Sequence, residues 1–537
     1  MMLEEMLKGC DYAERYPDDG TFMNREVLGV AYDSRKVVEG YLFVAIKGER
    51  YDGHDFIKDA VGRGAIAVVH NHEISGYGIG NSEINSPIVK PGSTVCFISV
   101  KDSKRALACI SNNFYGRPTE NLTLIGVTGT NGKTTTTYIL KSILESWRKN
   151  VGLIGTIQYM IKDRAYPAPH TTPESLEFQG LLRSMALSGC THVVAEVSSH
   201  ALTQYRVDGA VFQAAVFTNL TRDHLDFHKT MEDYFRAKER LFLELLDEAG
   251  TAVINLDDPF GKKLNSALRE LRPGLRILTY GLETGADIVA DEIEASFEGL
   301  RLVLSFRGRN YPISSKLTGM PNVYNIMSAV GASISLNIPW QAILNGIDNM
   351  DNITGRFEKI DAGQKFICVI DYAHTEDALE RLITTAREIV KEKAGKQSPH
   401  YPPLLKGGLS PRIITVFGCG GDRDRGKRPK MGDVATNLSD YVIITSDNPR
   451  SEDPMDIIKD IVTGVKTGNY LIEPDRREAI RKAVEKAEDG DIILVAGKGH
   501  EDYQEIKGER HPFRDRDVVK EAIKNRLRNS GCRRTDG

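Results

Sequence analysis

The chain has 537 residues, of which 41% are hydrophobic and 27% are charged, and its formal net charge at pH 7 is −4. This length predicts three or four domains, each with a sizeable core. Because general nucleic-acid-binding proteins are normally basic, the charge balance argues against that class, and we expect no nucleic-acid partner.

Residues 1 to 120 have the pattern of a small α/β domain. Apolar, strand-like runs occur at 27–35, 40–48, 65–69 and 95–100. The polar turn Asp33-Ser34-Arg35 lies between two of these predicted strands. Such a turn can hold a ligand, but taken alone it more often only connects strands.

The stretch from Leu122 to Thr137 predicts a phosphate site. An apolar run typical of a buried strand leads into Thr128-Gly-Thr-Asn-Gly-Lys-Thr134, and apolar residues then recur at helical spacing. In this context the loop N–H groups and the helix N-terminus surround an anion, Lys133 reaches the outer phosphates, and Thr134 ligates Mg²⁺. The strict motif has glycine where this chain has Val127, and a Gly-rich turn without a ligand is the alternative. The sequence favours an ATP site.

A second apolar strand, predicted at 192–197, carries Glu196 near its end. An acidic residue on a second strand after a phosphate loop is the expected place for a metal-holding carboxylate. A third strand, at 214–217, is followed by Asp223, His224 and Asp226. Sheets of α/β proteins place ligands just past strand ends, so this cluster is a candidate for the same site.

Lys238 lies on the apolar stripe of the next predicted helix. The stripe consists of Tyr234, Phe235, Leu241, Phe242 and Leu245. A lysine there either extends its ammonium to water or has a function. If it is desolvated, its pKa falls and its amine becomes nucleophilic. The pattern alone leaves both interpretations open.

Two polar clusters of the same region resemble substrate loops. His170-Thr-Thr-Pro173 could donate hydroxyl hydrogen bonds to an anionic ligand, and Ser198, Gln204 and Arg206 follow the Glu196 strand. The region closes with Gly319-Met-Pro-Asn-Val-Tyr-Asn325, which opens an Ala/Ser-rich helix, and with Gly355-Arg-Phe-Glu358.

Residues from 354 onward predict another α/β unit. Its strand-like runs lie at 366–374, 413–418, 441–445 and 491–495, and each ends in a polar, charged or Gly-rich loop. The Pro/Gly/Ser-rich stretch 396–411 indicates an inserted surface loop. Acidic and basic groups in three of the loops suggest a zwitterionic or carboxylate ligand held by Arg pairs. For any one loop, a solvated and inert face is the alternative.

The cysteine pattern and the lengths of the apolar runs indicate the cellular compartment. The cysteines are scattered without a C-x-x-C pair: Cys10, Cys96, Cys109, Cys190, Cys368, Cys419 and Cys532. This predicts reduced thiols rather than a disulfide framework or a zinc site. The N-terminus lacks an apolar core of signal-peptide length, and no apolar run reaches the length of about 18 residues typical of a membrane span. We expect a cytoplasmic protein.

The motifs taken together resemble the Mur ligases in identity and order. They are Thr128–Thr134, Glu196-Val-Ser-Ser-His200, Asp223-His-Leu-Asp226, Asn322-Val-Tyr-Asn325, Gly355-Arg-Phe-Glu358 and Asp371-Tyr-Ala-His374. The resemblance covers essentially the whole chain. It implies a three-domain α/β fold: a UDP-sugar nucleotide-binding domain at 1–120, a central ATP-binding domain with a P-loop ATPase-type sheet at 121–353, and a Rossmann-like amino-acid-binding domain at 354–537.

Within that family, Gly420-Gly-Asp-Arg-Asp-Arg-Gly-Lys-Arg-Pro429 and Asp447-Asn-Pro-Arg450 are similar to the members that use meso-2,6-diaminopimelate. The resemblance implies a monomer that joins this amino acid to UDP-N-acetylmuramoyl-L-alanyl-D-glutamate through an acyl phosphate, with ATP as co-substrate and Mg²⁺ as cofactor. The alternatives are a Mur ligase that adds L-lysine, a folylpolyglutamate synthetase-like ligase, and a catalytically silent nucleotide-binding scaffold.

The resemblance also implies a role for each candidate residue. The expected catalytic residues are Lys133, Lys238 and His224. The expected ATP-binding residues are Gly129, Thr130, Asn131, Gly132, Lys133, Thr134, Thr135, Asn325, Arg356 and Asp371. The expected contacts to the UDP-linked dipeptide are Ser34, Thr171, Thr172, Ser198, Gln204 and Arg206. The expected diaminopimelate-binding residues are Arg423, Asp447, Asn448, Pro449, Arg450, Gly497 and Glu501. The expected metal ligands are Thr134, Glu196, His224 and Lys238, the last as a carbamate.

Overall fold

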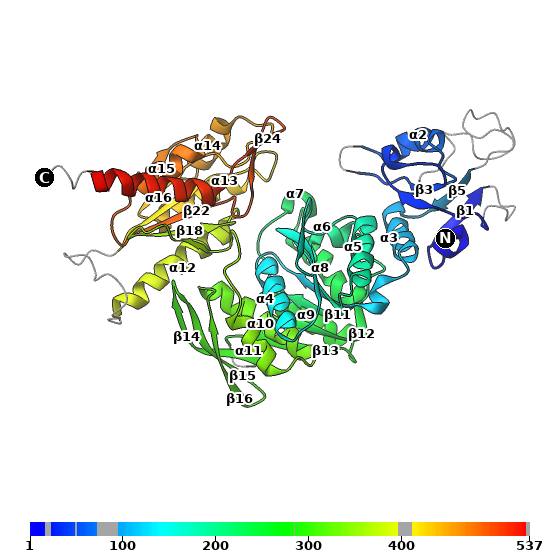
Figure 1. Ribbon diagram of the computed structural model, residues 1–537, viewed down its shortest axis with the longest axis horizontal. Coiled ribbons are helices and arrows are strands. Elements are labelled where there is room, and N and C mark those ends of the chain that lie inside the picture. The colour runs from blue at the N-terminus through cyan, green and yellow to red at the C-terminus, as the bar shows by residue number, and fades with distance from the viewer. Residues whose placement is uncertain (17–22, 49–50, 72–94, 284, 396–410, 533–537) are drawn as a thin grey trace.

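The computed structural model describes residues 1–537 except 17–22, 49–50, 72–94, 284, 396–410 and 533–537. The chain forms three α/β units around mixed sheets of five, eleven and six strands, which confirms the predicted fold class. Figure 1 shows the central unit between the first and the C-terminal units. The domain boundaries near residues 120 and 353 stay predictions.

The first sheet has the order β1-β5-β4-β3-β2, in which only β1 runs antiparallel to its neighbour. Its strands are β1 (Tyr12–Tyr16), β2 (Gly29–Ala31), β3 (Tyr41–Val44), β4 (Ala67–His70) and β5 (Cys96–Val100). The helices of this unit are α1 (Leu3–Met6), η1 (Ser34–Lys36), η2 (Gly53–Phe56), α2 (Ile57–Gly62) and α3 (Ser103–Phe114). The four predicted strand-like runs therefore form β2 to β5.

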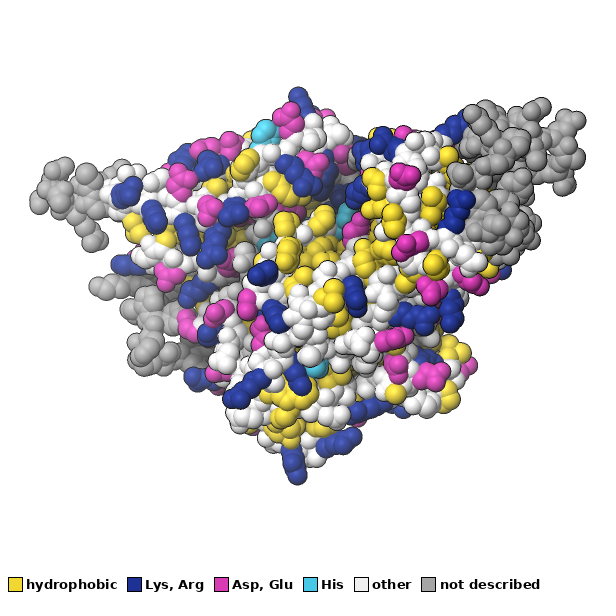
Figure 2. Space-filling view, turned by 45° about the vertical axis from the view of Figure 1, so that its right-hand side comes forward, with side chains coloured by type: hydrophobic (Ala, Val, Ile, Leu, Met, Phe, Trp, Pro, Cys, Tyr) yellow, Lys and Arg dark blue, Asp and Glu magenta, His cyan; other side chains and the backbone are white. Residues whose placement is uncertain are grey.

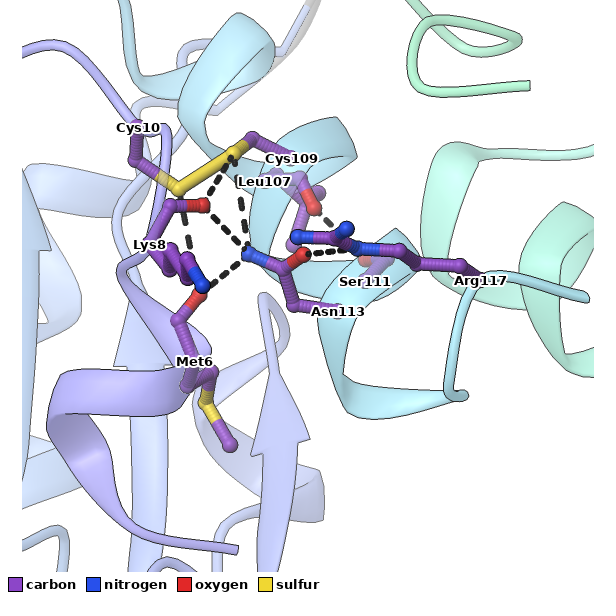
Figure 3. Close-up of a disulfide and its surroundings, with 8 residues drawn as sticks. All are labelled: Met6, Lys8, Cys10, Leu107, Cys109, Ser111, Asn113 and Arg117. Atoms are coloured by element: carbon purple, nitrogen blue, oxygen red, sulfur yellow. Dashed lines mark hydrogen bonds between the residues drawn. A yellow bond between two sulfur atoms is a disulfide. The ribbon is translucent and has the colours of Figure 1, made fainter. Parts of the chain in front are cut away.

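A disulfide joins Cys10, just after α1, to Cys109 on α3 (Figure 3). The prediction that these two cysteines are reduced thiols is wrong. They are 99 residues apart in sequence and meet only because α1 packs on α3. The Asn113 amide, also on α3, donates hydrogen bonds to the carbonyl oxygens of Met6 (3.0 Å) and Lys8 (2.8 Å). Hydrogen bonds and the disulfide together fix the N-terminal segment on α3.

The central sheet has β6 (Thr123–Thr128) at its middle, between the parallel strands β10 (His192–Glu196) and β11 (Phe212–Phe217). The remaining strands are β7 (Val151–Ile154), β8 (Gln158–Ile161), β9 (Arg164–Pro167), β12 (Leu246–Asn255), β13 (Arg276–Gly281), β14 (Ile288–Ser296), β15 (Gly299–Phe306) and β16 (Arg309–Ser315). Because strand side chains alternate between faces, Ile125 and Val127 of β6 pack into one core and Leu124 into another.

Helices cover both faces of this sheet. They are η4 (Pro118–Asn121), α4 (Lys133–Ser146), α5 (Ser175–Leu187), α6 (Ser199–Thr203), α7 (Leu225–His228), α8 (Met231–Arg240), the π-helical η5 (Leu241–Leu245), α9 (Pro259–Leu271), α10 (Met320–Ser335) and α11 (Trp340–Asp348). Apolar residues of α4, α10 and α11 fill one core, and those of α5, α8 and η5 fill the other. The predicted order of strand, Gly-rich loop and helix at 122–147 is thereby confirmed.

The C-terminal sheet has the order β17-β18-β22-β19-β20-β21 and is parallel except for β17. Its strands are β17 (Glu358–Ile360), β18 (Ile367–Asp371), β19 (Ile413–Phe417), β20 (Tyr441–Ile444), β21 (Tyr470–Ile472) and β22 (Ile492–Ala496), with a separate hairpin of β23 (Tyr503–Ile506) and β24 (Glu509–Pro512). The helices are α12 (Glu376–Gly395), α13 (Lys427–Leu438), α14 (Pro454–Val462), α15 (Arg476–Lys486) and α16 (Asp515–Cys532). Of the predicted inserted loop 396–411, residues 396–410 lie outside the described residues.

The surface carries charges of both signs. On the face drawn in Figure 2, the Lys and Arg side chains are interspersed with Asp and Glu. Over the part of the chain that the structure describes, no helix has both the length and the apolar character needed to cross a bilayer.

The disulfide gives a prediction about stability. We expect Cys10→Ser to lower the free energy of unfolding of the first unit by about 2–4 kcal/mol, because the bond closes a long loop in the unfolded chain. Chemical denaturation under oxidising conditions measures this. Cys109→Ser should cause the same loss, and the double variant no further loss. An unchanged denaturation midpoint in Cys10→Ser would show that the bond does not form in solution.

Candidate active site

A cavity of about 560 Å³ lies between the central and the C-terminal units. The central unit lines it with residues 130–135 of the phosphate loop and with 218–221, which follow β11. The C-terminal unit contributes Arg356, Asp371 and His374, among others. Most of these residues follow the carboxyl ends of parallel strands, where α/β sheets place their ligands.

Two glycines give the phosphate loop its shape. Gly129 (φ +148°) and Gly132 (φ +87°) have backbone conformations that favour glycine, and a Cβ atom there would collide with Thr218 and Asn325, respectively. Asn219 holds the loop in place, because its carbonyl accepts from Thr130 N–H (2.9 Å) and its side-chain oxygen from Asn131 N–H (3.0 Å). Val127 belongs to strand β6, so the departure from the strict motif leaves the loop intact.

Lys133 and Thr134 begin helix α4 at the floor of the cavity. The Lys133 ammonium donates to the carbonyl oxygens of Gly129 (2.9 Å) and Thr130 (2.8 Å), and desolvation lowers its pKa. The Thr134 hydroxyl donates to Glu196 (3.0 Å) and accepts from Arg356 (3.2 Å). The phosphate loop, the end of strand β10 and the C-terminal unit therefore meet at Thr134.

Glu196 is a fully buried carboxylate (0% exposed) at the end of β10. Besides the Thr134 hydroxyl, it accepts the backbone N–H of Thr156 (2.8 Å) and the hydroxyl of Thr156 (2.9 Å). A carboxylate and two hydroxyl oxygens are the hard donors that Mg²⁺ prefers. Within the described ranges, no three His, Cys, Asp or Glu side chains form a metal site by themselves. The predicted set thus depends on Thr134 and on a modified Lys238.

Lys238 lies beneath the phosphate loop and is 1% exposed, so its predicted place on the buried stripe is confirmed. Its ammonium donates to the Gly129 carbonyl (2.8 Å), which also accepts from Lys133, and lies 4.6 Å from the centre of the Tyr234 ring. Burial chiefly, and then the charge of Lys133, place the Lys238 pKa well below its ordinary value. Lys238 is therefore the candidate for a neutral, nucleophilic amine.

His224 lines the same cavity in a left-handed conformation (φ +53°). Its Nε2 lies 3.4 Å from a carboxylate oxygen of Asp223. Burial lowers the pKa of His224 to about 3, although the Asp223 charge opposes the shift. A neutral imidazole is the form that ligates a metal.

The three residues predicted to hold the nucleotide also line the cavity. The Asn325 amide donates to Asn322 (2.9 Å), and the Arg356 guanidinium lies 4.6 Å from the Tyr372 ring. Asp371 accepts from the backbone N–H groups of Phe357 (2.7 Å) and Ala373 (2.8 Å), and burial raises its pKa. The structure therefore brings together the phosphate loop and these residues from two units.

The residues predicted to hold the dipeptide divide into two groups. Thr171 and Ser198 line the cavity, and the Thr171 hydroxyl lies 3.1 Å from that of Thr156. Thr172 lies outside the cavity lining. Its hydroxyl donates to the Glu196 carbonyl (2.7 Å) and accepts from the Ser198 N–H (3.1 Å).

The second group extends toward the first unit. Arg206 donates to Gln204 (2.6 Å) and lies 3.4 Å from Glu174. Ser34 is buried at the start of η1, near Tyr32, whose hydroxyl donates to Glu177 of α5 at 3.0 Å. The dipeptide candidates thus extend from the cavity toward the contact between the first and central units.

The predicted amino-acid residues lie in three loops that meet at the carboxyl end of the C-terminal sheet, outside the cavity lining. The Asn448 amide donates to Glu501 (2.7 Å), and the Asn448 carbonyl accepts from Gly421 N–H (2.9 Å). A Cβ atom on Gly497 would lie 2.6 Å from an Asp447 carboxylate oxygen. The predicted convergence of the loops is therefore confirmed.

The two arginines of these loops, Arg450 and Arg423, differ in exposure. Arg450 donates to the Gly421 carbonyl (2.6 Å) and is half-buried, whereas Arg423 is exposed and donates to the Asp422 carbonyl (3.3 Å). The Pro449 carbonyl accepts from Glu452 N–H (3.0 Å) and closes the turn.

Sequence reasoning missed several residues of the site. Thr156 connects Glu196 to Thr171, Asn219 holds the phosphate loop, and Lys498 connects Asn448 to Glu501. Asn219 lies between the predicted strand 214–217 and the predicted Asp223, and Lys498 lies between the predicted Gly497 and Glu501. Nothing in the local pattern around Thr156 indicates its role.

Comparisons with known proteins agree with this geometry. Family models match for the Mur ligase family, catalytic domain (26–115), the Mur ligase middle domain (127–333) and the Mur ligase, glutamate ligase domain (404–499). The UDP-N-acetylmuramoyl-L-alanyl-D-glutamate--2,6-diaminopimelate ligase of Solibacter usitatus (strain Ellin6076) is 44% identical over 507 residues, 93% of this chain and 94% of that protein. The chain belongs to the Mur ligase family.

Two further similarities cover almost the whole chain. A ligase of the same name from Caldanaerobacter subterraneus subsp. tengcongensis is 43% identical over 525 residues, 97% of this chain and 99% of that protein. A solved structure of a ligase of this name is 32% identical, has a TM-score of 0.66, and covers 98% of this chain and 99% of its own. The predicted family and the predicted class, an ATP-dependent amide ligase, are confirmed.

Lys133 provides a test of the phosphate site of this Mur ligase. We expect Lys133→Ala to lower kcat/KM at least about 100-fold, because the variant lacks the cation nearest the loop that cradles the phosphates. ADP release in the presence of all substrates measures this. Lys141→Ala is the matched control and should keep normal activity, because Lys141 of the same helix pairs with Glu145 (2.6 Å) and is not part of the cavity lining. ADP release by Lys133→Ala at the normal rate would contradict the phosphate-site assignment.

Proposed function

We propose that this Mur ligase joins meso-2,6-diaminopimelate to the D-glutamate of UDP-N-acetylmuramoyl-L-alanyl-D-glutamate, using ATP. The observation that carries the proposal is the loop cluster of the C-terminal unit, in which the charge of Asp447 acts on Glu501 and the half-buried Arg450 lies 3.9 Å from Glu505. Anionic and cationic groups in one cluster match an amino acid whose far end is itself zwitterionic. The names of the relatives that are 43% and 44% identical over nearly the whole chain support the same substrate.

The chemistry requires activation of the D-glutamate carboxylate. A free carboxylate is a poor electrophile, because amide formation would have to expel oxide. Transfer of the ATP γ-phosphoryl group gives an acyl phosphate, whose leaving group is phosphate. The amine of diaminopimelate then attacks, and the tetrahedral intermediate collapses to the amide. Holding both reactants in one water-poor site supplies much of the rate enhancement.

The residues at the cavity floor fit a Mg²⁺ site. Thr134, Glu196 and His224 would hold one ion, and the carboxylated form of Lys238 would supply anionic oxygens to a second, since these donors are oxygens and one imidazole nitrogen. When bound, Mg²⁺ neutralises negative charge on the phosphoryl group. Lys238 has the properties that carboxylation needs, because it is buried and its pKa is well below the ordinary value, and the neutral form of its amine adds to CO₂ with loss of one proton.

The chain's own groups position the substrates. Lys133 and the loop N–H groups would hold the phosphates, while Asn325, Arg356 and Asp371 would hold the rest of the nucleotide. Thr171 and Ser198 face the cavity, so they would orient the D-glutamate end of the dipeptide toward the phosphates. Thr172, Gln204, Arg206 and Ser34 would serve the remainder of the UDP-linked substrate, with Thr172 acting through its neighbours.

Such a ligase serves peptidoglycan precursor synthesis and thereby cell wall biogenesis, cell shape and cell division. We propose a cytoplasmic monomer, in keeping with nucleotide-linked substrates. The L-lysine alternative fits the site less well, because lysine would leave Arg450 without a carboxylate. A folylpolyglutamate synthetase-like activity fits less well, because the phosphate loop of those enzymes lies near the N-terminus, whereas here about 120 residues precede it. A silent scaffold fits less well because Lys133, Glu196 and Lys238 are all present.

A ligation assay tests the proposal directly. The enzyme is given ATP, the UDP-linked dipeptide and either meso-diaminopimelate or L-lysine, and the product is read by mass spectrometry. We expect a tripeptide product with diaminopimelate. Equal saturation by L-lysine would contradict the choice of amino acid while leaving the ligase assignment intact.

Lys238 gives a second prediction. We expect kcat of Lys238→Ala to fall at least about 100-fold, because the variant lacks the carbamate that would hold Mg²⁺ during phosphoryl transfer. Short carboxylates such as acetate should restore part of the activity by replacing the carbamate. Activity with and without acetate measures this.

Labelling provides an independent measurement. Carbon-13 NMR of the enzyme in labelled bicarbonate should show a carbamate signal that Lys238→Ala lacks. Lys263→Ala, a nearby exposed variant, should keep both the signal and the activity. If Lys238→Ala is active and the wild-type enzyme shows no carbamate signal, Lys238 has only a packing role.

Arg450 gives a third prediction, on the choice of amino acid. A guanidinium takes a carboxylate through two parallel hydrogen bonds, and a site built around such a group rejects an analogue that lacks its partner by roughly 10⁴. We expect Arg450→Ala to lose most activity with diaminopimelate, while KM for ATP stays normal. Steady-state kinetics measure both, with the exposed Arg477→Ala as control. Unchanged KM for diaminopimelate in Arg450→Ala would point to Arg423 instead.

A further inference from the structure

Lys498 is a lysine buried completely (0% exposed) inside the loop cluster that would bind the amino acid. Its ammonium donates to the Asn448 side-chain oxygen (3.1 Å) and to a carboxylate oxygen of Glu501 (2.9 Å). A desolvated ammonium is costly unless it is paired and hydrogen-bonded. Lys498 therefore depends on these two neighbours, both of which belong to the predicted amino-acid site.

The Asn448 amide can face only one way in this network. Its oxygen accepts from Lys498 and from the backbone N–H of Glu505 (2.9 Å). Its NH₂ group must then be the donor to Glu501, at 2.7 Å. Lys498 thus fixes both partners, because it holds the Asn448 oxygen and shares the same Glu501 oxygen with the Asn448 amide.

Lys498 also sets the charge of the cluster. The half-buried Glu501 carboxylate lies 2.9 Å from this ammonium, and the buried Asp447 is a second acid of the same cluster. Burial raises the pKa of Glu501, the Asp447 charge raises it further, and Lys498 opposes both. Without Lys498, Glu501 would more readily take up a proton and lose its attraction for an ammonium group.

We propose that Lys498 is a specificity-determining positioning residue for a diamino acid, which keeps Glu501 and Asn448 oriented toward the ammonium group of the incoming substrate. This inference rests on the proposed function, because it assumes that the loop cluster binds the amino acid. Lys498 itself acts through its neighbours and does not touch the substrate.

The test compares three variants of the full-length enzyme. Lys498→Met removes the charge, Lys498→Arg keeps it, and Lys466→Met changes an exposed lysine of the same unit as the control. We expect Lys498→Met to raise KM for meso-diaminopimelate roughly 100-fold, because it removes one partner of a buried charge pair. KM for ATP and for the UDP-linked dipeptide should stay within about twofold, since Lys498, Asn448 and Glu501 are not part of the cavity lining. Lys498→Arg should restore part of the amino-acid affinity.

The outcomes separate this role from a purely structural one. Parallel increases in all three KM values, or an unchanged KM for the amino acid, would overturn the proposal. Lys498→Gln serves as a second variant, and loss of the folded state in both Lys498→Met and Lys498→Gln would also overturn it, because Lys498 would then serve the fold. If the wild type uses a different amino acid, the proposed function fails, and KM for that amino acid still tests Lys498.

Discussion

The buried carboxylate of Glu196 connects the segments that line the cavity between the central and C-terminal units. It accepts hydrogen bonds from Thr134, at the start of α4, and from Thr156, between β7 and β8. A carboxylate with no exposure persists only where its oxygens are satisfied by donors. The phosphate loop, the end of β10 and the β7–β8 connection therefore have one relative arrangement, and the other cavity residues are placed against it.

The C-terminal unit meets the central unit through Phe297, which packs into the C-terminal core, and meets the phosphate loop through polar contacts. Asp377 of α12 accepts from Asn131 of the phosphate loop (2.8 Å) and from Thr221 (3.1 Å), and Arg356 donates to Thr134 (3.2 Å). Polar interfaces between domains of one chain permit relative motion more readily than large apolar ones. Such contacts suit an enzyme that must admit three substrates between its units and release three products.

Features that are encoded by residues close together in sequence could be predicted, and features that depend on contacts between distant segments could not. The phosphate loop, the Glu196 strand and the buried place of Lys238 are all encoded within short windows, by apolar runs, glycines and helical periodicity. The pairing of Cys10 with Cys109 and the role of Thr156 were missed, because each depends on a contact between distant segments. The sequence predicted that loops of the C-terminal unit converge, yet it could not show that Lys498 holds two of them together.

The sequence by itself determined the α/β class, the strand–loop–helix at the phosphate site and the order of motifs that marks a Mur ligase. These follow from residue periodicity and from backbone conformations that only glycine adopts easily, so they need no knowledge of distant contacts. Tertiary structure alone decided which side chains share a hydrogen bond and which charges are desolvated. The pair of Lys133 and the buried Lys238 at one carbonyl, and the Lys498 network, exist because the tertiary structure brings together groups far apart in sequence.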